Sequence, residues 1–422
     1  MAERTLDVWC FGDRAGPLTE TDSGLHFAYA EAWREAGGPA LSFGLPLSGD
    51  FDNAAATAFF GGLLPEGNPR LTIARQLGIS AENDFSLLDA LAGDTAGAVV
   101  ITRPGVAPGP QTGDVVWLDE GELAKELDEL PARPMHADED GEYRLSLAGA
   151  QDKLPVVVAD DGRIGLTHGQ TPSTHIIKTP IPGLDATVAN EALCLDIGRR
   201  LGIDTVAAEP RRAGDREFLL VTRYDREREG GGVARLHQED FCQALGIPSA
   251  RKYQAEGGPD LAACFGLIRR VTAAPGRDAV ALLDAIALSF LVGNHDAHGK
   301  NYSLLYRHGM AKPDLSPIYD VLSTFVYRGA LRMSRKLAMS IGKEYRPDYV
   351  RVRHLEAMLA NAGLTRGTAK RRLRRIASEA PDAALSASGN LKEQGWDAPM
   401  LGRIVDTVDT RSRWLMTIVD GT

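Results

Sequence analysis

The feature that most constrains the fold is a change in hydrophobic patterning near residue 235. Before it, apolar segments are short and bounded by turn residues, as in KLPVVVA, THIIK and REFLLVTRYD, which is typical of strands. After it, longer apolar segments such as LAACFGLIRRV and DAVALLDAIALSFLVGN predict helices. We therefore expect an α+β, two-lobed fold in which a β-rich part precedes a larger helical part.

The length of 422 residues predicts two or three domains. Residues 1–103 mix strand-like LDVWCFG and LHFAY with helix-like LLDALAG, and predict a small β-rich N-terminal subdomain. Residues 104–114 are dense in proline and glycine, which indicates a linker. We expect an N-lobe over 115–232, with one helix at NEALCLDIGRRLG, and a helical C-lobe over 233–422.

Composition excludes several classes of protein. The formal net charge of −10 gives no global attraction to nucleic acid or anionic membranes. The four cysteines have neither C-x-x-C pairing nor metal-ligand spacing, so we expect buried thiols. No apolar window is long enough to span a membrane, and the N-terminus lacks a secretion signal, so we expect a cytoplasmic protein. The basic run at 365–377 predicts a solvated helix face or, alternatively, a phosphate contact.

A polar loop follows the apolar helix that ends in SFLVGN, and it reads His295-Asp-Ala-His-Gly-Lys-Asn301. Phosphoryl transfer to a hydroxyl needs a carboxylate to orient and deprotonate the acceptor, and oxygen ligands for Mg²⁺. Asp296 and Asn301 can supply one of each, at the five-residue spacing that protein kinases use. Asp320, in SPIYDVLST, follows in the order of a second Mg²⁺-binding aspartate.

The same loop has two other interpretations, a metal-hydrolase ligand pair or a helix-capping turn. Neither accounts for Asp320 or for Lys178, which ends the apolar run THIIK as a lysine that reaches nucleotide phosphates must. Glu191, near the start of the next helix, is available to pair with Lys178. The order of lysine, glutamate, Asp-x-x-x-x-Asn and aspartate favours an ATP-dependent phosphotransferase of the protein-kinase type.

The segment SLAGAQDK, which begins at Ser146 and ends at Lys153, lies between two predicted strands ahead of Lys178. Kinases have their phosphate-covering loop at this place. The segment is not GxGxxG, but backbone N–H groups in a turn can bind phosphate without several glycines.

Nine segments in order carry a family resemblance: LSLAGAQDKLPV, STHIIKTP, ANEALCLDIGRRLGI, LLVTRYDR, LHQEDFCQALG, KYQAEGGP, GNHDAHGKNYSLLY, PIYDVLST and KLAMSIG. Together they resemble the HipA family of serine/threonine kinases, the toxins of bacterial HipBA toxin–antitoxin modules. LSFGLPLSG, FFGGLLPEG and DFSLLDALAGDTAGAVV are similar to that family's first domain, so the resemblance covers nearly the whole chain.

The resemblance implies a protein-kinase-like fold that uses ATP and Mg²⁺. It makes Asp296 the catalytic base, Asn301 and Asp320 the Mg²⁺ ligands, and Lys178 the lysine that binds the ATP phosphates. Ser146 aligns with an autophosphorylated serine whose modification switches the kinase off. Thr222 stands where an acidic residue can occur beside the adenine pocket. The nucleotide-binding residues that the resemblance implies are Ala148, Gly149, Ala150, Gln151, Arg223, Tyr224 and His298.

Members of the family are similar in phosphorylating aminoacyl-tRNA synthetases and in binding a helix-turn-helix antitoxin, HipB, on operator DNA. The acidic net charge is consistent with the antitoxin carrying most of the DNA affinity. Two alternatives remain open at this stage. One is a catalytically idle kinase fold that serves as the antitoxin's co-repressor, and the other is a small-molecule kinase with the same catalytic residues.

Overall fold

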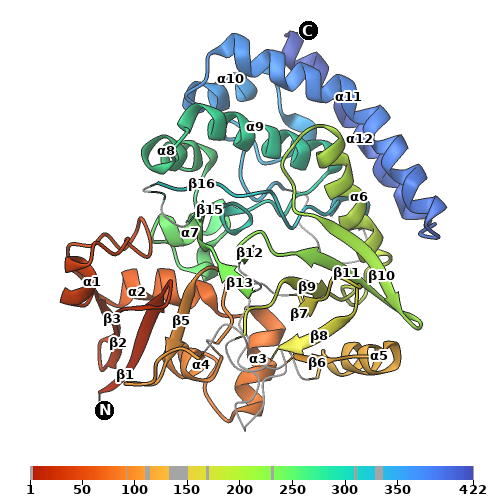
Figure 1. Ribbon diagram of the computed structural model, residues 1–422. Coiled ribbons are helices and arrows are strands. Elements are labelled where there is room, and N and C mark those ends of the chain that lie inside the picture. Colours follow the sequence, from red (N-terminus) through yellow and green to blue (C-terminus); the bar gives the residue numbers. More distant parts are fainter. Residues whose placement is uncertain are drawn as a thin grey trace. The chain divides into compact units, whose positions relative to one another are not determined.

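The computed structural model describes residues 3–91, 93–109, 115–132, 151–167, 171–229, 232–307, 310, 312–327 and 336–421 (Figure 1). They form two compact units. The first comprises Met1–Thr179, Arg211–Ala250 and Leu305–Ala311, and the second comprises Pro180–Pro210, Arg251–Leu304 and Lys312–Thr422. Both units draw on separated stretches of the chain, so they do not follow the three predicted consecutive segments, whose boundaries stay a prediction.

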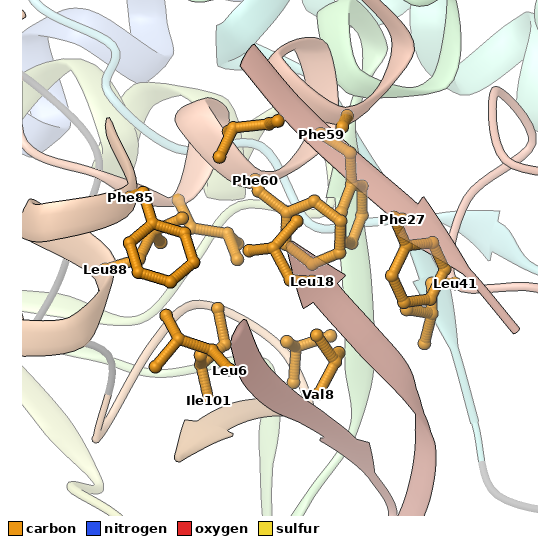
Figure 2. Close-up of a cluster of buried hydrophobic side chains, with 14 of the residues drawn as sticks. Leu6, Val8, Leu18, Phe27, Leu41, Phe59, Phe60, Phe85, Leu88 and Ile101 are labelled. Atoms are coloured by element: carbon orange, nitrogen blue, oxygen red, sulfur yellow. The ribbon is translucent and has the colours of Figure 1, made fainter. Parts of the chain in front are cut away.

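The first unit contains an antiparallel sheet in the order β4-β3-β2-β1-β5. Its strands are β1 (Arg4–Cys10), β2 (Asp13–Thr21), β3 (Gly24–Ala28), β4 (Asp50–Phe51) and β5 (Val99–Thr102). The helices of this region are α1 (Glu31–Glu35), α2 (Asn53–Phe60), η1 (Gly61–Leu63), α3 (Gly67–Gln76) and α4 (Asp84–Leu91). Alternate strand residues such as Leu6, Val8 and Leu18 pack against Phe60 of α2 and Phe85 of α4 in one core (Figure 2).

A second sheet in this unit has the order β10-β11-β9-β7-β8-β6. Its strands are β6 (Val115–Trp117), β7 (Lys153–Val158), β8 (Ile164–Thr167), β9 (His175–Lys178), β10 (Ala208–Ala213) and β11 (Arg216–Thr222). The strands predicted at KLPVVVA, THIIK and REFLLVTRYD are thus confirmed as β7, β9 and β11. Shorter elements follow: β12 (Arg226–Glu229), β13 (Gly232–Arg235), β14 (His237–Asp240) and α7 (Phe241–Ala244).

One helix of this region was not predicted from the sequence. Helix α5 (Glu120–Glu129) begins with a capping box between Asp119 and Glu122. Its buried Leu123 and Leu127 belong to the same apolar cluster as Ile177 of β9. The β-rich segment therefore holds a second helix, which covers one face of the second sheet.

The second unit is mainly helical, as predicted. Its helices are α6 (Thr187–Arg200), α8 (Leu261–Val271), α9 (Pro275–Val292), α10 (Val352–Asn361), α11 (Arg366–Glu393) and α12 (Pro399–Asp420). Shorter elements include η4 (Gln254–Glu256), η5 (Gly299–Asn301), η6 (Phe325–Tyr327), η7 (Pro347–Tyr349) and β16 (Asp314–Leu315). Strand β15 (Ser303–Tyr306) begins in this unit and ends in the first. The long helices α11 and α12 pack along each other, and both pack against α9 and α6 (Figure 1).

The predicted basic run lies at the start of α11 and is largely neutralised within this unit. Its arginines form ion pairs between Arg366 and Glu356, Arg372 and Asp284, Arg374 and Asp420, and Arg375 and Glu379. These pairs favour the solvated-face interpretation over a phosphate contact.

The remaining predictions from composition concern thiols and membranes. All four cysteines are buried free thiols, as expected. Within the ranges that the structure describes, every helix is too short or too polar to cross a bilayer.

Candidate active site

The polar loop of the second unit begins where α9 ends. Gly293 ends this helix in the left-handed region at φ 74°, and a Cβ there would approach Cβ of Phe325 to 2.7 Å, so only glycine fits. Asn294 then uses both ends of its side chain. Its Oδ1 accepts the N–H of Asp296 at 3.0 Å, and its Nδ2 donates to the carbonyl of Asp320 at 3.4 Å. A single residue thus links the two candidate acidic positions.

The loop places Asp296 and Asn301 together. The Asp296 residue is exposed, whereas Asn301 is buried in η5. Nδ2 of Asn301 donates to the backbone carbonyl of Asp296 at 3.2 Å, and the N–H of His298 donates to the same carbonyl at 2.8 Å. Because the amide nitrogen of Asn301 is used within the loop, its oxygen is the end that can serve as a metal ligand.

The segment around Asp320 is joined to this loop by several hydrogen bonds. The hydroxyl of Tyr319 donates to the carbonyl of Lys300 at 2.8 Å, and the N–H of His295 donates to Oγ1 of Thr324 at 2.9 Å. Asp320 itself has φ 54°, a left-handed conformation that is uncommon outside glycine and that clusters at functional sites. Its segment is therefore held against the loop at a strained aspartate.

The oxygen donors of this arrangement fit Mg²⁺. Magnesium prefers hard oxygen ligands and usually takes one or two carboxylates together with substrate phosphates. Asn301 can supply an amide oxygen and Asp320 a carboxylate, whereas no three His, Cys, Asp or Glu side chains in the described part of the chain cluster as a metal site. The donor set suits an ion that is shared with a nucleotide.

The two histidines of the loop contact different side chains. The buried His295 ring lies 3.4 Å, through Nε2, from Nη2 of Arg411 and packs on Phe325 at 6.0 Å between centroids. The His298 ring packs edge-on against Tyr253, with centroids 5.2 Å apart. This geometry speaks against the metal-hydrolase interpretation of His-Asp-x-His.

Sequence reasoning missed two residues that position this site. Asn190 of α6 is buried, donates to the carbonyl of Ser323 at 3.0 Å and accepts its N–H at 2.8 Å, which fixes the segment after Asp320. Tyr253 donates its hydroxyl to Oδ1 of Asp296 at 2.7 Å. In the sequence, Tyr253 is marked by its place in the family-like segment KYQAEGGP.

In the first unit, Lys178 ends β9, which lies between β11 and β7, so the expected central-strand position is observed. The Lys178 residue is 5% exposed. The register sets Lys153 of β7 directly opposite it, and residues that pair in this way have side chains on the same face. Ile177, the neighbour of Lys178, faces the core beneath α5, so both lysines lie on the opposite face. Lys153 was not singled out from the sequence.

The predicted phosphate loop is described only at its end. Ser146, Ala148, Gly149 and Ala150 lie outside the described residues. Gln151 is described, and its Nε2 donates to the carbonyl of Thr179 at 2.6 Å, which ties the end of the loop to the residue after Lys178.

The pairing of Lys178 with Glu191 stays a prediction. Glu191 is buried on α6 in the second unit, whereas Lys178 belongs to the first.

The adenine-pocket role expected of Arg223 stays a prediction. Its side chain is 1% exposed and binds Asp225 and Asp94 at 2.7 and 3.3 Å. The guanidinium belongs to a buried ion cluster, since it binds both of these carboxylates. The hydroxyl of Tyr224 donates to Oε1 of Gln238, and the contribution of Tyr224 to the pocket also stays a prediction.

In the second unit, a loop that follows a helix carries a candidate base and an amide, and a second aspartate comes later. In the first unit, a central strand ends in a lysine. These features are those of a protein-kinase-like enzyme. Comparison with family models agrees. A model described as the HipA-like C-terminal domain matches residues 145–384, and one described as the HipA N-terminal domain matches residues 6–102.

Curated relatives match nearly the whole chain. It is 40% identical over 421 residues to "Putative kinase Y4mE" of Sinorhizobium fredii, with 98% of this chain and 99% of the relative covered. It is 31% identical over 367 residues to the serine/threonine-protein kinase toxin HipA of Shewanella oneidensis, with 84% and 82% covered. The chain belongs to the HipA family of serine/threonine-protein kinases.

A solved structure has the same fold. A chain from the complex of HipA, HipB and operator DNA of Shewanella oneidensis MR-1 matches with a TM-score of 0.84 at 26% identity. The match covers 99% of this chain and 98% of that one. The predicted α+β, kinase-like fold is therefore confirmed.

Proposed function

We propose that this chain is an ATP-dependent serine/threonine kinase that acts as the toxin of a HipBA-type toxin–antitoxin module. The observation that carries the proposal is the linked arrangement of Asp296, Asn301 and Asp320, joined through Asn294. Phosphoryl transfer depends mainly on positioning and on stabilising charge, and this arrangement supplies a carboxylate for the acceptor and oxygens for Mg²⁺. Membership of the HipA family supports the same reaction.

The other nucleotide contacts of the proposal come from the first unit and from the loop. Lys178 binds the ATP phosphates, and Gln151 belongs to the phosphate-covering loop with Ala148, Gly149 and Ala150. Tyr224 and His298 contribute further nucleotide contacts. Ser146 is the proposed site of an inactivating autophosphorylation, since a phosphate near ATP and carboxylates would repel the loop.

The proposed target is an aminoacyl-tRNA synthetase, so that modification halts translation in the cytoplasm. The proposed partner is a HipB-like helix-turn-helix antitoxin that brings the pair to operator DNA. The similar solved chain comes from a complex with HipB and operator DNA, which supports this proposal. The acidic chain leaves most of the DNA affinity to that partner.

The test is phosphate incorporation measured by intact-mass spectrometry. With ATP and Mg²⁺, wild type gains one phosphate on Ser146, and Asp296→Gln gains none. Phosphoproteomics after brief induction of each form then identifies the cellular target. A wild type that binds ATP but gains and transfers no phosphate refutes the kinase proposal and favours the co-repressor.

A further inference from the structure

We propose that Tyr253 is a positioning residue for the phosphoryl transfer, which it serves by fixing the carboxylate of Asp296. This inference rests on the proposed function, in which Asp296 is the catalytic base. The hydroxyl of Tyr253 donates to Oδ1 of Asp296 at 2.7 Å, which is the usual length of such a bond. One carboxylate oxygen is thereby engaged, and Oδ2 is left for the acceptor hydroxyl.

Asp296 needs such a partner because it is exposed. A carboxylate in water rotates about χ2 at little cost, and a base must lie within hydrogen-bond reach of the proton that it accepts. The loop fixes the backbone of Asp296 through Asn294 and Asn301, but those bonds reach its N–H and carbonyl. Within the described part of this unit, the hydrogen bond from Tyr253 is the one that holds the Asp296 side chain itself.

Tyr253 is in turn held by its own surroundings. Its half-buried ring packs edge-on on His298 at 86°. The next residue, Gln254, donates its N–H to the carbonyl of Ala338 at 3.2 Å, and Ala338 donates its own N–H to the carbonyl of His295 at 2.9 Å. The tyrosine and the catalytic loop are thus attached to one common segment, so their separation is fixed by backbone bonds.

The two glycines of KYQAEGGP build the turn that presents Tyr253. Gly257 has φ 96°, which side chains rarely adopt. A Cβ at Gly258 would lie 2.5 Å from the carbonyl oxygen of Arg251 and 2.7 Å from the backbone of Lys252. The N–H of Gly258 donates to the carbonyl of Tyr253 at 2.9 Å, which closes the turn. The glycines of this motif therefore hold the turn that places Tyr253 beside Asp296.

The experiment uses the full chain with Tyr253→Phe, which removes the hydroxyl and retains the ring that packs on His298. The rate of self-phosphorylation is followed by intact mass over a series of ATP concentrations at saturating Mg²⁺. A hydrogen bond to a charged group contributes about 1.5 to 3 kcal/mol. Its loss from the transition state therefore predicts about a 10- to 100-fold fall in the maximal rate. The ATP concentration at half-maximal rate should stay within about twofold, because the tyrosine contacts the base and not the nucleotide.

Tyr349→Phe is the matched control, since Tyr349 is exposed in the same unit and stacks on Arg346. It should leave both quantities unchanged, and both variants should melt at the wild-type temperature. An unchanged maximal rate in Tyr253→Phe overturns the inference. An increased rate also overturns it, because the tyrosine would then block access to the base. A wild type without any transfer is a different result, since it overturns the proposed function along with the inference.

Discussion

Asp94 offers a sharp test of how the first unit is held together. Its carboxylate is fully buried, accepts the N–H and hydroxyl of Ser173 at 3.0 and 2.7 Å, and binds Arg226 and Arg235 at 2.8 and 3.2 Å. It also binds Arg223. Burial by itself would raise the pKa of Asp94, but the neighbouring guanidinium groups outweigh it and hold that pKa well below its usual range.

The whole cluster contains three arginines and two aspartates, Asp94 and Asp225. Burial also acts to raise the pKa of Asp225, yet Arg223 and Arg226 lower it to about 2. Burial, followed by repulsion from the nearby Arg223, lowers the pKa of Arg226 to about 10 although Asp225 and Asp94 act to raise it. Asp94→Asn removes one of the two aspartate charges of this cluster while it retains nearly the same volume.

We expect Asp94→Asn to destabilise the first unit by about 3 to 5 kcal/mol, the usual cost of leaving buried charges uncompensated. For a unit of this size, that loss corresponds to a fall in melting temperature of roughly 6 to 20 °C. Unfolding of this unit can be followed by the fluorescence of Trp9 and Trp33, which lie in it.

The matched control is Asp89→Asn. Asp89 pairs with Arg103 at 3.1 Å in the same unit, but the arginine side chain of that pair is 64% exposed. Exposed pairs contribute about 0 to 1 kcal/mol, so the control should melt close to wild type. If Asp94→Asn melts with the control, the buried cluster does not stabilise the unit and the reasoning from desolvation is wrong.

Three further predictions concern other parts of the chain. Burial raises the pKa of Glu239 to about 7, although the hydroxyls of Ser42 and Tyr306 donate to its carboxylate. The stabilisation of the folded state by protonated Glu239 is therefore fully present below pH ~4.5 and is lost as the pH rises to about 7. The stability difference between wild type and Glu239→Gln, from urea unfolding at each pH, should shift by roughly 3 kcal/mol over that range, and a flat difference contradicts it. Lys178→Met should raise the ATP concentration needed for half-maximal phosphorylation, and Lys153→Met should raise it to a smaller extent, because both lysines lie on one face of the sheet. If this ATP concentration is equal for wild type and both variants, neither lysine binds phosphate. Phe60→Ala, in the core of Figure 2, should cost about 3 to 5 kcal/mol in unfolding free energy, whereas Leu71→Ala, at a side chain that is 52% exposed, should cost little.

Local patterns predicted the elements that carry the site. Strand β9 and helix α9 have apolar sequences whose lengths and flanking residues decide their type, so both could be predicted. Asp296 and Asn301 lie five positions apart on one loop, and that spacing is visible without any fold. Helix α5 was missed because it is one short amphipathic stretch beside a linker, although its capping box at Asp119 was a usable signal.

Contacts between distant parts of the chain could not be predicted in the same way. Tyr253 and Asp296 are 43 positions apart, and Arg223 and Asp94 are 129 apart. A local pattern gives the type of element on which a residue lies, but it does not say which partner the side chain meets across the fold. The ion pairs of Arg223 with Asp94 and Asp225 could for this reason not be predicted, whereas its place beside the adenine pocket stays a prediction.

That cluster also explains why the N-terminal subdomain belongs to the same unit as the second sheet. Asp94, the carbonyl of Thr95 and the N–H of Gly97 come from the subdomain, and they bind Arg223 and Asp225 next to the predicted adenine stretch. Buried guanidinium groups without these partners would have to be hydrated or would lose their packing, at a cost of several kcal/mol each. Residues 1–103 therefore fold together with this cluster, and a chain that begins after them would leave Arg223, Arg226 and Arg235 without Asp94.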